Sequence, residues 1–229
     1  MRKRHTLLPL ALALALSMAL LQAAMAGPID TADDWAGDRI IEAIEKGFVP
    51  LAIQDNYKDV ITRLEVCTMA VRWIEYTLER SIDELLEEND VERNYAAFSD
   101  TSDPDILAAY SLGIINGEVA PTTTTPGVFN PGGSLTRQQA AVIVTHTCSA
   151  IGVNVLNPPV ADFADMHLAA SWAVSGISFA RAHGIMTGTT PEPPYFFDPN
   201  GTFTRQQSIL LFNNINPGNL PTGPNPATD

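Results

Sequence analysis

The stretch Leu135-Thr136-Arg137-Gln138-Gln139 decides how the chain is organised, because it recurs in altered form at two other places. Ile61-Thr62-Arg63-Leu64-Glu65 precedes it by 74 residues, and Phe203-Thr204-Arg205-Gln206-Gln207 follows it by 68 residues. Each version reads apolar residue, threonine, arginine, any residue, and then glutamate or glutamine. Repetition at such spacings is typical of a chain built from tandem copies of one unit.

Other features keep the same register around these three motifs. A glycine precedes each motif, with an isoleucine seven residues and an alanine four residues before it: Gly47, Gly113 and Gly184; Ile40, Ile106 and Ile177; Ala43, Ala109 and Ala180. Trp35 and Trp172 stand twelve residues before the first and third glycines. Phe-x-Asp opens the second and third copies, and Phe-x-Pro lies eight residues before their arginines: Phe98 to Asp100, Phe163 to Asp165, Phe129 to Pro131 and Phe197 to Pro199.

Each copy predicts a helix, a loop and a second helix. The isoleucine and alanine share one face of the first helix, and the glycine suits its left-handed C-terminal cap. The second helix begins at the Thr-Arg motif, after which apolar residues at +4, +7 and often +11 form one buried stripe. A lone pair of helices cannot cover that stripe. We therefore expect an all-α fold, in which three helix-loop-helix repeats form one pseudo-threefold, three-lobed domain around a central three-helix bundle.

The predicted copies span residues 27–92, 93–157 and 158–216. The first copy departs from the pattern, because it has no Phe-x-Asp opening and its loop reads Gln54-Asp55-Asn56-Tyr57-Lys58. Its second helix is expected to run on past Glu79. Residues 217–229 hold four prolines and two glycines and are expected to form a disordered tail.

Residues 1–26 read as a secretory signal peptide. A basic start, Met1-Arg2-Lys3-Arg4, precedes an apolar run from Leu7 to Leu21 and the small-x-small sequence Ala24-Met25-Ala26. A membrane anchor is the alternative, but the run is short for a span. We expect cleavage and export, with no membrane-spanning segment in the remainder.

Composition narrows the classes of function. The chain has 26 acidic and 13 basic residues and a net charge of -13, which argues against nucleic-acid binding. Four scattered histidines and two cysteines give no metal or cofactor site, and no Ser-His-Asp or Cys-His arrangement indicates an enzyme. Cys67 and Cys148 fall at +4 and +11 of different copies. If the second helices are parallel and in equal register, this offset places the thiols too far apart for a disulfide, so both are expected to be free and buried.

Together these motifs resemble the S-layer homology domain, over about residues 34–215. The resemblance implies a module on the bacterial surface that attaches non-covalently to wall-linked polysaccharide, often one with pyruvylated amino sugars. It also implies that Arg63, Arg137 and Arg205 contact the ligand. The family usually has glutamate two residues after this arginine, whereas here only Glu65 is kept and the other copies have Gln139 and Gln207.

The motif residues have structural and functional interpretations. Thr62, Thr136 and Thr204 should form capping boxes with Glu65, Gln139 and Gln207. Each arginine occupies the first helical position, where the helix dipole disfavours a cation. Either it pairs with an acid of a neighbouring copy, such as Asp100 or Asp165, or it binds an anion together with the helix amides.

The remaining candidates are aromatic and acidic. Trp35 and Trp172 either pack over a neighbouring copy or stack on a sugar. Asp100 and Asp165 either fix the loop before the first helix or contact sugar hydroxyls. The sequence therefore predicts a secreted, non-catalytic binding module of the bacterial cell wall or S-layer, with cell-wall polysaccharide and S-layer proteins as partners. The alternative is a module for protein–protein interaction within a surface coat.

Overall fold

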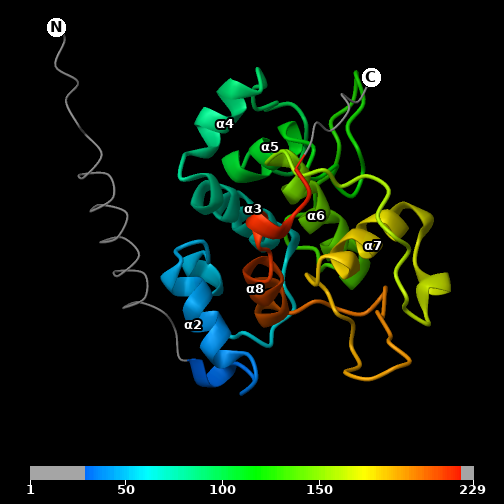
Figure 1. Ribbon diagram of the computed structural model, residues 1–229. Coiled ribbons are helices and arrows are strands. Elements are labelled where there is room, and N and C mark those ends of the chain that lie inside the picture. Colours follow the sequence, from blue (N-terminus) through cyan, green and yellow to red (C-terminus); the bar gives the residue numbers. More distant parts are fainter. Residues whose placement is uncertain (1–28, 223–229) are drawn as a thin grey trace, which may run out of the picture.

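The computed structural model describes residues 29–222, and within them the fold is helical, with isolated β-bridges and no strand (Figure 1). The all-α prediction is therefore confirmed. The predicted signal peptide lies outside the described residues. The α-helices are α2 (Gly37–Glu45), α3 (Arg63–Leu78), α4 (Ile82–Glu88), α5 (Pro104–Ser111), α6 (Arg137–Ala150), α7 (Val174–Ala182) and α8 (Arg205–Asn213). Short 3-10 helices lie at Ile29–Thr31, Leu51–Ile53, Met166–Leu168, Ser171–Ala173 and Pro217–Asn219.

Three of these helices begin at the arginine of the repeated motif. α3, α6 and α8 start at Arg63, Arg137 and Arg205, and each of the three contacts the other two. The first helix of a copy packs against the second helix of the copy before it: α5 against α3, α7 against α6, and α2 against α8. Copy one therefore follows copy three in space, and the order of the copies is cyclic.

A closed ring of backbone hydrogen bonds joins the starts of α3, α6 and α8. The amides of the three motif arginines donate to the carbonyl four residues before the next arginine in the cycle. The bonds are Arg63 to Gly133 at 2.8 Å, Arg137 to Gly201 at 3.0 Å and Arg205 to Asp59 at 2.9 Å. Single β-bridges follow the same cycle at Thr62–Ser134, Thr136–Thr202 and Val60–Thr204. The ring fixes each arginine against the loop of the next copy.

The second helix of copy one is shorter than expected. Glu79 has a left-handed conformation, with φ of 53°, and ends α3 instead of continuing it. Ser81 then starts α4 with its own capping box, in which Glu84 is the partner. The prediction of one helix running past Glu79 is wrong, because a serine that can cap a new helix follows directly.

A glycine in the left-handed conformation follows the first helix of each copy. Gly47, Gly113 and Gly184 have φ of 83°, 71° and 68°, a region that other residues enter only with strain. The glycines thus turn the chain from the first helix into the loop.

The interior is continuous and contains both thiols. Cys67 and Cys148 are free and buried in the apolar core, so the prediction of unpaired cysteines is confirmed. The prediction of a disordered tail is wrong for residues 217–222. Leu220 is buried, and the amide of Asn154 donates to the carbonyl of Pro221 at 2.9 Å. This segment therefore packs against the loop that follows α6. Among residues 29–222, no helix has the length and apolar character needed to cross a membrane.

Candidate functional site: the junctions between copies

We call the contact between the start of a second helix and the next copy a junction. The first junction contains Arg63, the second Arg137 and the third Arg205. All three helix starts have complete capping boxes, in which Thr62, Thr136 and Thr204 accept from the backbone of Glu65, Gln139 and Gln207 and receive the reciprocal side-chain contact.

The amides at these helix starts are already used. The amide of the first helical residue, the arginine, donates within the ring described above. The amide of the third helical residue donates to the threonine of the capping box. The second donates to a loop carbonyl of the next copy: Leu64 to Pro131 at 3.0 Å, Gln138 to Pro199 at 3.0 Å and Gln206 to Tyr57 at 2.8 Å. An anion cannot bind the helix amides, so that part of the functional prediction is wrong. A ligand would have to use side chains.

Arg63 and Arg137 lie in matching environments. Each Nε donates at 2.7 Å to the carbonyl of a phenylalanine in the next copy, Phe129 or Phe197. Each guanidinium also lies over the ring of that phenylalanine, with Cζ 4.8 Å and 5.2 Å from the ring centroids. Only 9% of Arg63 and 7% of Arg137 is exposed. The Phe-x-Pro loop therefore provides both the wall and the carbonyl that hold the arginine.

The Nη groups of these two arginines are unpaired. Within residues 29–222 no group accepts a hydrogen bond from them, and neither arginine forms a salt bridge. Burial lowers the pKa of Arg137, while the charges of Asp198 and Asp165 oppose that shift. The predicted pairing of an arginine with Asp100 or Asp165 is not formed. A guanidinium that is largely desolvated and has free donors is suited to bind an oxyanion.

Arg205 is held differently. Its Nη2 donates to Glu65 Oε1 at 2.6 Å, and its Nη1 donates to the carbonyl of Asp55 at 3.2 Å. Asp55 stands where Phe129 and Phe197 stand in the other copies, eight residues before the arginine, so the third junction has no phenylalanine for stacking. The contacts of Arg205 are those of an ion pair with Glu65, so its charge is already neutralised.

Asp100 and Asp165 hold the loops on which the arginines lie. The carboxylate of Asp100 accepts from the amides of Phe129 and Asn130 at 2.9 Å and 2.7 Å. Asp165 accepts from Phe197 and Asp198 at 2.8 Å and 2.7 Å. Burial raises the pKa of Asp100, but these amides outweigh it, so the pKa lies below its usual value. These contacts match the loop-fixing interpretation.

The two tryptophans are on the surface. Trp35 is 60% exposed just before α2, and Trp172 is 56% exposed in the 3-10 helix Ser171–Ala173. More than half of each tryptophan is therefore open to solvent. Their indoles are available to a ligand.

A glutamine ties each exposed tryptophan to a junction. The Oε1 of Gln138 accepts from the amide of Ala170 at 2.9 Å, two residues before Trp172. The Oε1 of Gln206 accepts from the amide of Asp33 at 3.0 Å, two residues before Trp35. The second and third junctions thus each place an arginine and an exposed indole on adjoining segments.

The first junction lacks both parts of this arrangement. Leu64 replaces the glutamine, and Thr101 stands at the position of the tryptophan. Sequence reasoning missed the two glutamines, although a signal was present. Gln138 and Gln206 directly follow their arginines, and in both cases the next copy in the cycle has a tryptophan. Leu64 follows Arg63, and there the next copy has Thr101 instead.

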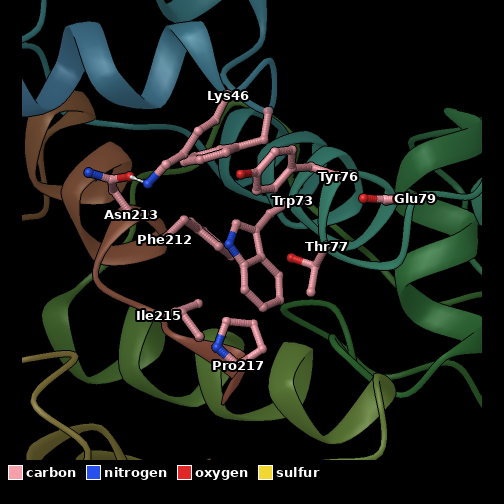
Figure 2. A pocket seen from close by; sticks show the side chains of 10 residues that line it. Lys46, Trp73, Tyr76, Thr77, Glu79, Phe212, Asn213, Ile215 and Pro217 are labelled. Carbon is pink, nitrogen blue, oxygen red and sulfur yellow. Dashed lines mark hydrogen bonds between the residues drawn. The ribbon is translucent and has the colours of Figure 1, made fainter. Parts of the chain in front are cut away.

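A pocket of about 290 Å³ lies at the other end of α3 and α8 (Figure 2). Trp73 and Phe212 form part of its wall, and Lys46 closes one side through its hydrogen bond to Asn213 at 2.8 Å. The pocket is lined by Lys46, Phe48, Trp73, Tyr76, Thr77, Glu79, Phe212, Asn213, Ile215 and Pro217. None of the predicted site residues is among them.

Comparison with known families gives a match for part of the second copy. Residues 98–141, from the Phe-x-Asp opening of copy two to the first turn of α6, match the S-layer homology domain. This segment is therefore similar to the S-layer homology domain. Domains of this family are binding modules, and the match indicates association with the cell surface or cell wall. No curated protein matches the chain.

Proposed function

We propose that this protein is an exported module that binds cell-wall polysaccharide non-covalently, with the second junction as its principal site. The observation that carries the proposal is Arg137, which is buried and charged. Its Nη groups have no partner within residues 29–222, and its segment is tied to the exposed Trp172. The ligand contacts would come from Arg137 and Trp172. Arg63, Arg205 and Trp35 occupy the corresponding positions of the other junctions.

The chemistry of this pair suits an acidic sugar. A carboxylate, such as the pyruvate group of a pyruvylated amino sugar, would accept charge-assisted hydrogen bonds from Arg137. The exposed indole of Trp172 offers an aromatic face to the apolar face of a sugar ring. Asp100 and Asp165 would act indirectly in this account, by holding the loops beneath Arg63 and Arg137.

The repeat organisation supports one binding unit made of three copies, 27–92, 93–157 and 158–216. Each junction takes residues from two copies, so a single isolated copy would have no complete junction. We propose that residues 1–26 direct export and are removed. The protein would then act outside the cell, at the wall or within an S-layer.

Sedimentation with purified cell-wall sacculi tests the proposal. The chain from Gly27 should sediment with intact sacculi and remain in solution after the secondary polysaccharide is stripped from them. Sedimentation that survives stripping would instead favour a protein or peptidoglycan partner, and the coat-interaction alternative would then be preferred.

A further inference from the structure

The pocket of Figure 2 contains a buried hydrogen-bond donor that the fold leaves unused. Trp73 lines the pocket and is only 2% exposed, with its indole nitrogen on the side that faces Phe212 (Figure 2). Within residues 29–222 this indole N–H donates to no acceptor, whereas the ammonium of Lys46 is held by Glu42 and Asn213. A buried donor normally has a partner, so the pocket is suited to an acceptor from outside the fold.

The size and lining of this pocket favour a short peptide segment. Its volume of about 290 Å³ is just below the roughly 300–1,000 Å³ that is usual for small-molecule sites, so a few side chains would fill it. Tyr76 is 45% exposed and offers an accessible ring. A proline-containing segment suits such an aromatic pocket, since proline has an apolar ring and a carbonyl but no N–H that needs a partner. The other apolar residues of the lining are Phe48, Phe212, Ile215 and Pro217.

The chain itself presents a segment of this kind away from the pocket. Residues 156–160 read Leu-Asn-Pro-Pro-Val, and Val160 is 79% exposed, more than any other large hydrophobic residue within residues 29–222. The two consecutive prolines restrict the backbone to extended conformations. The amide of Ala161 donates to Ser178 Oγ at 3.1 Å, which anchors the segment to α7. The segment is therefore preorganised, and it cannot enter its own pocket between α3 and α8 without leaving α7.

We infer that residues 156–160 of one copy of the chain bind in the pocket of a second copy, where a backbone carbonyl of the segment accepts from the indole N–H of Trp73. The charges agree with this contact. The chain has a net charge of -13, so two copies repel each other, but residues 153–161 carry no charge. The two charged residues of the pocket, Lys46 and Glu79, have opposite signs.

This contact joins two different surfaces, so each associated copy still has a free segment on one side or a free pocket on the other. Association of this heterologous kind continues into rows of molecules and does not stop at a pair. The inference concerns how copies of the chain contact one another, and it does not depend on the proposed binding to the wall.

Sedimentation velocity of the chain from Gly27, over a series of concentrations and without wall material, tests the inference. The average mass should rise past that of a pair as the concentration increases. Val160→Asp should abolish this association, because it would place a carboxylate in an apolar pocket. Val119→Asp is the matched control, since Val119 is 57% exposed and lies outside both the segment and the pocket, and it should associate like the wild-type chain.

The pocket side of the contact is tested separately. Trp73→Phe keeps an aromatic ring but removes the donor, and it should weaken association about tenfold. The Val160→Asp chain keeps an open pocket, so it should bind a synthetic peptide of residues 154–162. NMR should then show a shift of the Trp73 indole signal, with those of Trp35 and Trp172 unchanged, and this readout needs no change in the core.

Three results would each overturn the inference. They are a wild-type chain that stays monomeric at every concentration, equal association of the two aspartate variants, and a peptide that leaves the Trp73 signal in place. None of them affects sedimentation with sacculi, so the proposed function is judged independently.

Discussion

Arg205 Nη2 lies 2.6 Å from Glu65 Oε1, so the start of α8 is ion-paired with the start of α3 across 140 residues of sequence. Both side chains are shielded, with 18% and 14% exposed. The pair lies where the third copy meets the first, the one junction at which no phenylalanine stacks on the arginine. An ion pair there takes the place of the stacked arginine of the other two junctions.

Glu65→Gln should lower the free energy of unfolding by about 1–3 kcal/mol, because Arg205 loses its acceptor while the capping box remains. Urea denaturation measures the change. Glu88→Gln is the control, since it breaks the exposed pair with Arg80 and should change stability by less than about 1 kcal/mol. Equal losses in the two variants would show that the Arg205 pair has no special role in closing the ring.

Arg137→Ala should abolish wall binding and also lower stability by about 1–3 kcal/mol, because Phe197 loses the hydrogen bond to its carbonyl. Thr136→Ala should lower stability by about 1 kcal/mol and leave the binding of the folded protein unchanged. Sedimentation with sacculi at a temperature where both variants are folded separates the two effects. Normal binding by folded Arg137→Ala would make this arginine purely structural.

Trp172→Ala and Trp73→Ala should have opposite consequences. Trp172 is exposed, so its loss should change stability by no more than about 0.5 kcal/mol while weakening wall binding roughly tenfold. Trp73 is 2% exposed, so its loss should lower stability by about 3–5 kcal/mol. Thermal melting and wall binding of both variants check this. Unchanged binding by Trp172→Ala would remove the indole from the site.

Both thiols should be unreactive in the native protein. Cys67 and Cys148 are buried, and burial raises the pKa of each thiol to about 12. Labelling without reductant should modify no thiol in the native chain and two after denaturation. Fewer than two after denaturation would indicate a disulfide and contradict the packing described above.

Stability should fall in mild acid partly because of His146. Burial lowers its pKa below the ordinary 6.5, and its Nδ1 lies 3.3 Å from the carbonyl of Ile114. Below pH 6.5 the unfolded chain therefore binds more protons than the folded one, so stability decreases as the pH falls from 6.5. His146→Gln should flatten this dependence when stability is measured at a series of pH values. His183, whose pKa burial also lowers, would account for a remaining slope.

Local features of the fold could be predicted because they depend on neighbouring residues. The Thr-x-x-Glu/Gln pattern defines the starts of α3, α6 and α8 within one turn of helix, and glycine defines where the first helices end. The break after Leu78 was also readable in principle, since Ser81 and Glu84 form the same capping pattern.

The site depends on contacts between copies, which the sequence of one copy does not contain. The repeat predicts that three arginines are equivalent, yet their partners come from the next copy in a cycle that closes only in three dimensions. Asp55 and Glu65 therefore change the state of Arg205, although both are far from it in sequence.

The three tryptophan indoles allow the most direct test of wall binding at the second junction. Their N–H signals can be assigned by NMR with single Trp→Phe variants and followed while released wall polysaccharide is added. The account predicts that the Trp172 signal shifts, that Arg137→Ala abolishes this shift, and that the buried Trp73 signal at the pocket of Figure 2 stays in place. A shift of Trp73 with Trp172 unchanged would contradict the account and place binding at that pocket instead.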